Sequence, residues 1–122
     1  MEVDSQEIKL ALQQDNVKYV KVAITDLDGV LRGKYMHVDK FLKSIESGYG
    51  FCDVIFGWDS SDELYEFNVS DEQNLFTGWH TGFPDQTVKI LLDSKRTIPF
   101  EKNTPLFLSE LKGGEVCPRS VL

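Results

Sequence analysis

The sequence is poor in several features that define whole classes of protein. Its 122 residues include only two cysteines, Cys52 and Cys117, which lie far apart and have no partner at metal-ligand spacing. They cannot form a zinc site alone, and one possible bridge is weak evidence for secretion. We therefore favour two reduced thiols in a cytoplasmic protein.

Long apolar runs and clustered basic residues are also missing. No apolar stretch approaches the length of a membrane span, and the acidic N-terminus has no signal-peptide pattern. With 20 acidic and 13 basic side chains, the formal charge is −7. Nucleic-acid phosphates and anionic membranes both require clustered Lys and Arg, so the sequence predicts no nucleic-acid partner and no membrane partner.

What is present suits one small folded domain. Hydrophobic residues make up 41% of the chain and include eight phenylalanines, which is enough to fill a core. Alternating apolar residues predict a strand over 17–26, with Val20, Val22 and Ile24 on one side, and a second strand over 30–38. The Asp-Leu-Asp-Gly string between them suits a tight turn, so we expect a β-hairpin.

The pattern after the hairpin predicts an amphipathic helix that is capped by Asp39 and stopped by Gly48. A shorter surface helix near the N-terminus has Ser5 as its candidate cap. Further strands are expected over 51–58 and 88–93. A hairpin, a packed helix and then more strands indicate an α+β fold: a β-grasp-like mixed sheet with one packed helix plus a short N-terminal helix.

The string Asp-x-Asp-Gly-Val-Leu also occurs in the nucleophile loop of haloacid dehalogenase-like phosphatases. In that case Asp26 would attack phosphorus and Asp28 would transfer protons. Such enzymes also need later acids for Mg²⁺ and parallel strands that alternate with helices. Because residues 30–38 turn straight back as a strand, we favour a hairpin turn with two exposed acids, and the phosphatase stays an alternative.

The longer stretch from Thr25 to Met36 resembles the first hairpin of glutamine synthetase-like ligases. The family's Thr-Asp, Gly turn and Arg-Gly-Lys pattern is matched by Thr25, Asp26, Gly29, Arg32, Gly33 and Lys34. Later motifs follow in the family's order: "FGWDSSDE" resembles its Phe-Asp-Gly-Ser-Ser loop, "FPDQTVKILLD" and "RTIPF" its Pro-Asp-x-x-Thr and Ile-Pro-Trp region, and "GGEVCPRSVL" its Cys-Pro-Arg segment.

The resemblance covers only the family's N-terminal β-grasp domain. It implies an N-terminal helix over 1–16, the β-grasp domain over 17–112, and a linker over 113–122 into an absent catalytic domain. It also implies partners: the chain's own C-terminal catalytic domain and the neighbouring subunits of a homo-oligomeric ring. A stand-alone β-grasp interaction module is the remaining alternative.

The family joins ammonia or another amine to glutamate with ATP, through a γ-glutamyl phosphate. The full-length enzymes use ATP and Mg²⁺ or Mn²⁺, which neutralise phosphate charge. The family's metal ligands and ATP-binding residues lie in the catalytic domain, so the resemblance implies no cofactor and no metal site in this chain. We expect the chain alone to be inactive.

One loop of this domain reaches the active site of a neighbouring subunit in the family. The resemblance implies that Asp59 binds the ammonium or amine there, and that Ser60 and Ser61 are its substrate-loop hydroxyls. Ser60 replaces the family's common Gly, which leaves the acceptor amine open. Asp59 as a plain N-cap is an alternative, and Asp62 or Glu63 is the match if the alignment slips.

Two tryptophans are candidates for contact with a partner. Trp79 lies beside loop signals and is assigned to an interface; Trp58 is assigned there too, with the core as an equal alternative. His80 is expected on the surface or at an interface. Arg32 and Lys34 are expected on a solvated strand edge or at a contact with the neighbouring subunit.

Overall fold

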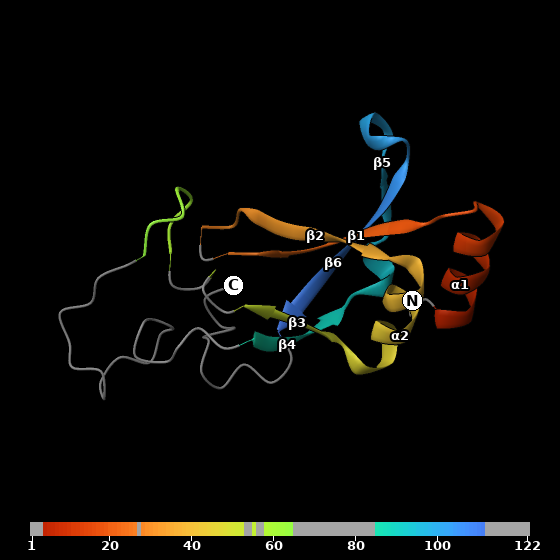
Figure 1. Ribbon diagram of the computed structural model, residues 1–122, viewed down its shortest axis with the longest axis horizontal. Helices are drawn as coiled ribbons and strands as arrows, with labels where there is room; N and C mark the ends of the chain where they lie inside the picture. Colours follow the sequence, from red (N-terminus) through yellow and green to blue (C-terminus); the bar gives the residue numbers. More distant parts are fainter. Residues whose placement is uncertain (1–3, 27, 53–54, 56–57, 65–84, 112–122) are drawn as a thin grey trace.

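The computed structural model describes residues 4–26, 28–52, 55, 58–64 and 85–111 (Figure 1). Two helices lie on one side of a mixed sheet. In chain order the elements are α1 (Ser5–Gln14), β1 (Tyr19–Thr25), β2 (Leu31–His37), α2 (Val38–Ser47), β3 (Tyr49–Cys52), β4 (Asp85–Ile90), the 3₁₀ turn η2 (Leu92–Ser94), β5 (Arg96–Ile98), the 3₁₀ turn η3 (Pro99–Glu101) and β6 (Thr104–Leu111).

The sheet has the strand order β2-β1-β6-β4-β3, and β5 pairs with the start of β6. Strands β1 and β2 form the predicted antiparallel hairpin, while β6 runs parallel to β1 and antiparallel to β4. A hairpin, a helix across the sheet and a last strand beside the first confirm the predicted α+β, β-grasp-like fold. No helix in the described part of the chain is long and apolar enough to cross a membrane.

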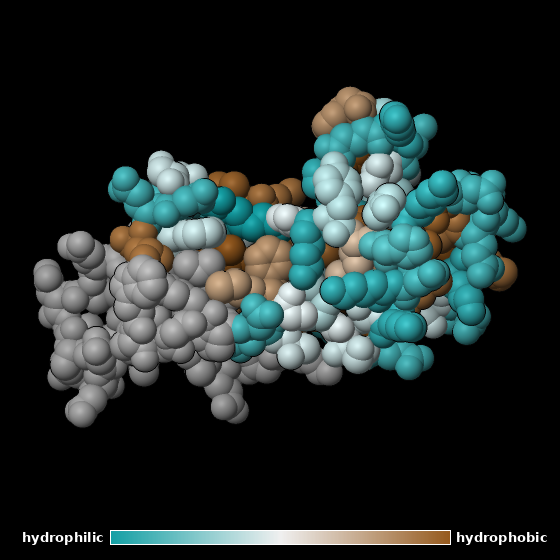
Figure 2. Space-filling model, in the orientation of Figure 1, coloured by the Kyte–Doolittle hydropathy of each residue, from teal (hydrophilic) through white to brown (hydrophobic). Residues whose placement is uncertain are grey.

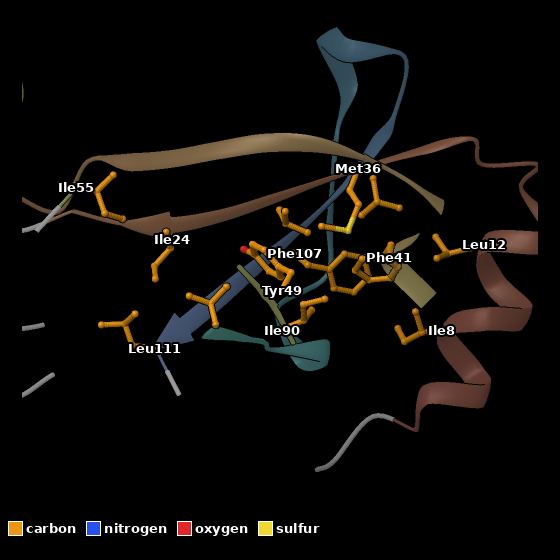
Figure 3. Packing of buried hydrophobic residues seen from close by; sticks show 13 residues of the cluster. Ile8, Leu12, Ile24, Met36, Phe41, Tyr49, Ile55, Ile90, Phe107 and Leu111 are labelled. Carbon is orange, nitrogen blue, oxygen red and sulfur yellow. The ribbon is translucent and has the colours of Figure 1, made fainter. Parts of the chain in front are cut away.

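The core lies between the sheet and the two helices (Figure 3). Phe41 of α2 meets Phe107 of β6 at its centre, with ring centroids 4.7 Å apart. Helix α1 covers one end of this core with Ile8 and Leu12. Val20, Val22 and Ile24 are buried, as predicted for one side of the first strand, and Ala23 on the other side is buried as well.

The N-caps of both helices lie one or two residues before the predicted caps, Ser5 and Asp39. The N-cap of α1 is Asp4, whose carboxylate accepts the Gln6 amide at 3.1 Å. The N-cap of α2 is His37, whose Nδ1 accepts the Asp39 amide at 3.1 Å, so the prediction of Asp39 as the cap is wrong. The predicted stop at Gly48 is confirmed, with φ at +78°.

Two predicted strands have different bounds in the structure. The strand expected over 51–58 begins earlier, as β3 (Tyr49–Cys52), and residues 53–54 and 56–57 of this prediction lie outside the described residues. The strand expected over 88–93 is β4, which begins at Asp85 and ends at Ile90 before η2. After β4 the apolar run continues in the sequence through Leu91 and Leu92, so the run alone does not mark where pairing ends.

A projecting arm made of β5 and η3 rises from the outer face of the sheet (Figure 1). Its Phe100 is 88% exposed. Glu101 ties the arm to the hairpin, because its carboxylate accepts the Tyr35 hydroxyl at 2.7 Å and pairs with Lys21 at 3.2 Å. These two partners lower the pKa of Glu101, the Tyr35 hydrogen bond first. In Figure 2 apolar surface lies along the hairpin edge beside this arm.

The core pair gives a first test of the packing. Phe107→Ala removes a fully buried ring and is expected to lower the free energy of unfolding by about 3–5 kcal/mol. Phe100→Ala is the matched control, since this ring is exposed, and is expected to change it by less than about 0.5 kcal/mol. Urea unfolding followed by circular dichroism measures both, and equal effects would contradict the core assignment.

The arm gives a second test, through pH. The folded state lowers the pKa of Glu101 below its ordinary value of 4.5. Its contacts with Tyr35 and Lys21 therefore stabilise the fold above that pH, and this stabilisation is lost as the pH falls below it. Unfolding curves between about pH 7 and about pH 3 are expected to show a smaller acid loss of stability in Glu101→Gln than in the parent. Asp93→Asn, at an exposed acid of η2, is the control and should keep the parent's acid loss.

Candidate functional site

Asp26 lies at the end of β1 and has no exposed surface. Its Oδ1 accepts the backbone amides of Asp28 and Val30, both at 2.9 Å. Its Oδ2 accepts Nε of Arg32 at 3.0 Å. The predicted turn-forming role of Asp26 is confirmed, but the expectation that this acid is exposed is wrong, because the turn amides and a guanidinium replace its water.

Arg32 of β2 connects this turn to another part of the chain. Its Nη1 donates to the Asp62 carboxylate, and its Nη2 donates to the backbone carbonyl oxygen of Asp59 at 3.3 Å. Its guanidinium carbon lies 5.3 Å from the centroid of the Trp58 ring, a cation–π distance. The hydrogen bonds to Asp26 and then to Asp62 raise the pKa of Arg32.

The loop over 58–64 is closed on itself. Its two ends pair as an antiparallel bridge. Inside it, the Asp59 amide donates to the Glu63 carbonyl at 2.8 Å and the Asp62 amide donates to the Asp59 carbonyl at 3.0 Å. The left-handed residue of the loop is Asp62, with φ at +65°, and not Ser60. The replacement of the family's Gly by Ser60 therefore introduces no left-handed strain at that position.

The Asp59 side chain is half-buried at the start of this loop. Its Oδ1 accepts the amides of Ser61 at 2.8 Å and Glu63 at 3.1 Å. Its Oδ2 accepts no hydrogen bond from the residues that the structure describes. One oxygen thus fixes the side chain, as the capping interpretation expects, while the other remains an acceptor for an outside donor.

Lys34 lies two residues beyond Arg32 on the same face of β2. Its Nζ donates to the Gly50 carbonyl at 3.0 Å and lies 5.1 Å and 5.6 Å from the ring centroids of Tyr49 and Phe51. Burial, and then repulsion from Lys40, lower the pKa of Lys34. The expectation of a solvated strand edge is wrong for both cations, because their register partners are the core residues Ile24 and Val22.

The other predicted site residues are placed as follows. Ser60 and Ser61 are exposed on the loop beside Asp59. Trp58 is half-buried against the core, and its indole Nε1 is buried with no hydrogen-bond partner in the described part of the chain. Trp79 and His80 lie outside the described residues.

No three His, Cys, Asp or Glu side chains come together as a metal-ligand set within the described ranges. Asp26 holds a guanidinium with Oδ2 and two amides with Oδ1, and Asp62 pairs with the same guanidinium. Both carboxylates therefore pair with the Arg32 guanidinium, and we assign no metal-dependent step to them.

Several curated proteins are similar to this chain. Type-1 glutamine synthetase 2 of Dictyostelium discoideum is 52% identical over 109 residues, covering 85% of the chain and 20% of that protein. Glutamate–isopropylamine ligase of a Pseudomonas species is 29% identical over 117 residues, covering 91% and 24%. Gamma-glutamylputrescine synthetase of Escherichia coli is 37% identical over 91 residues, covering 74% and 18%. The chain is homologous to the N-terminal domain of glutamine synthetase-like ligases.

This glutamine synthetase-like domain spans about a fifth of the length of the curated relatives it matches. A solved structure described as a GmaS/ADP complex matches 91% of the domain with a TM-score of 0.57 at 14% identity, and covers 20% of that chain. A second, described as apo GmaS without ligand, gives 0.55 at 14% identity over 82% of the domain and 19% of that chain. At this identity the structures support the fold alone. No protein-family model matches the chain.

The haloacid dehalogenase-like alternative is wrong for this glutamine synthetase-like domain. The strands on either side of the Asp-x-Asp motif are antiparallel neighbours, whereas that enzyme class needs a parallel doubly wound sheet. Both oxygens of Asp26 are also engaged within the protein, so this carboxylate is not available to attack phosphorus.

Substitution of the buried Asp26 tests whether its pair with Arg32 stabilises the domain. Asp26→Asn removes the buried carboxylate that holds Nε of Arg32 and leaves the exposed Asp62 as the remaining carboxylate partner of that cation in the described part of the chain. We expect a loss of about 3 kcal/mol in the free energy of unfolding. Asp93→Asn, at an exposed acid of η2, should change it by less than about 0.5 kcal/mol. Urea titration at neutral pH measures both; a harmless Asp26→Asn would show that the pair is not needed for stability.

Proposed function

We propose that this domain completes the active site of a neighbouring subunit in a homo-oligomeric, ATP-dependent ligase that joins ammonia or another amine to glutamate. The names of the relatives support the reaction class, since they include a glutamine synthetase and two glutamate–amine-type ligases. In the longer enzyme, ATP and Mg²⁺ or Mn²⁺ act in the catalytic domain, and residues 113–122 are the linker to it. The expected compartment is the cytoplasm.

The carboxylate of Asp59 is the group that we assign to the amine. The single observation that carries this assignment is its divided hydrogen bonding: Oδ1 is held by two loop amides, and Oδ2 faces no donor among the described residues. An ammonium ion donates hydrogen bonds and is attracted by negative charge, so Oδ2 is suited to bind it and to take a proton from it before attack. Ser60 and Ser61 border the same carboxylate.

The acceptor amine is proposed to be ammonia. The relative with 52% identity is named a glutamine synthetase, whereas those named for isopropylamine and putrescine are 29% and 37% identical. A larger amine is the second candidate, because two of the relatives are named for isopropylamine and putrescine. A panel of ammonium, isopropylamine and putrescine separates the two.

The assay uses a chimera in which this chain replaces the matching segment of the Dictyostelium glutamine synthetase. Phosphate release is measured with glutamate, ATP, Mg²⁺ and each amine in turn. Asp59→Asn is expected to lower kcat/KM for ammonium by about a hundredfold or more, the scale of a lost general base. The control is Asp93→Asn, at an exposed acid, and its kcat/KM for ammonium should stay within about twofold of the parent value.

Two outcomes would contradict the proposal. One is an assembled chimera in which Asp59→Asn turns over ammonium as fast as the parent. The other is sustained phosphate release by the 122-residue chain alone, which should be inactive without a catalytic domain. Size-exclusion chromatography establishes the assembly state of each variant before its rate is measured.

A further inference from the structure

The Arg32 side chain hydrogen-bonds to both the hairpin turn and the loop over 58–64. Its Nε is held at 3.0 Å by Asp26, which is itself buried and bound to two turn amides. Its side chain is only 19% exposed. The guanidinium is therefore fixed on the hairpin side before it meets the loop, and it acts as a rigid support and not as a mobile surface cation.

The loop end of Arg32 makes three contacts, and all of them fix where Asp59 lies. Nη2 donates to the carbonyl of Asp59 itself, Nη1 donates to Asp62, and the guanidinium lies over the Trp58 ring. The hydrogen bonds inside the loop hold its own shape but do not fix its position on the sheet. Within the described ranges, the packing of Trp58 on the core and the contacts of Arg32 connect the loop to the rest of the domain.

We propose that Arg32 is a positioning residue for the amine-binding carboxylate. It acts through the Asp59 backbone and the Asp62 side chain, and sets where Asp59 Oδ2 stands relative to the sheet. The inference rests on the proposed function of Asp59. This role requires a guanidinium, because its three nitrogens donate to three separate acceptors at the same time. A lysine has a single nitrogen and cannot replace all three hydrogen bonds.

The first experiment reports on the loop in the 122-residue chain, without catalysis. In Arg32→Lys, amide hydrogen exchange at Ser61 and Glu63, the two donors to Asp59, should become about tenfold faster or more, the scale of a lost charged hydrogen bond. Exchange at Val88 in the core should stay unchanged. Arg96→Lys is the matched control on exposed β5 and should leave both loop amides as in the parent.

The second experiment is a double-mutant cycle in the chimera. Arg32→Lys is expected to lower kcat/KM for ammonium by about a hundredfold, as for a reacting group displaced by about 1 Å, while KM for glutamate and for ATP stays within about twofold. In the Asp59→Asn background the same change should have little further effect, because Arg32 acts through Asp59. A purely structural role would instead give two losses that multiply.

The outcomes separate the two proposals. If Asp59→Asn is harmless, the proposed function fails. If Asp59→Asn is harmful while Arg32→Lys leaves ammonium turnover and the loop amides unchanged, or if the losses multiply, the role of Arg32 fails. If Arg32→Lys does not fold, Asp62→Asn replaces it, since this change keeps the Asp26–Arg32 pair. It should speed exchange at Ser61 and Glu63 and lower kcat/KM for ammonium, and no change in either would also overturn the role.

Discussion

The ion pair between Asp26 and Arg32 is the interaction on which the candidate site depends. A carboxylate with no exposed surface is costly unless donors replace its lost water. Two turn amides and one guanidinium do so, which joins the local geometry of the hairpin to a charge on the next strand. The same guanidinium also contacts the loop over 58–64. A change in the conformation of the turn therefore alters the contacts that hold the loop.

Strand β2 lies at the edge of the sheet, yet its charged side chains point toward the core side. Arg32 lies over Trp58, and Lys34 lies over the rings of Tyr49 and Phe51. Aromatic faces are favourable neighbours for cations that are partly removed from water. Inward-facing charges on an edge strand also oppose pairing with other strands. The open edge is thus protected by residues that serve the inside of the domain.

The fold could be predicted from local patterns, but the site only in part. Alternating apolar residues predict the hairpin, and an apolar stripe at helical spacing predicts α2. The N-cap of α2 differs from the prediction because the imidazole of His37 accepts the amide of Asp39. The assignment of Asp59 to the site rests on motif order and not on a chemical signal in the sequence, and it stays a prediction. Arg32 was misjudged because a charged residue on a strand edge is usually solvated, and its partner Asp62 lies 30 positions away with no local signal of contact.

The position of β6 has a consequence for how the domain forms. The last described strand is central: it runs beside β1 at one flank and β4 at the other. Until β6 has left the ribosome, the hairpin and the β3–β4 pair have no shared hydrogen-bonding partner. Such a topology has high contact order, so folding is slow compared with helical domains and the nascent hairpin must wait with its apolar face uncovered. During that interval Arg32 and Lys34 are charges on the uncovered face of an edge strand, a feature that opposes edge-to-edge pairing with other strands.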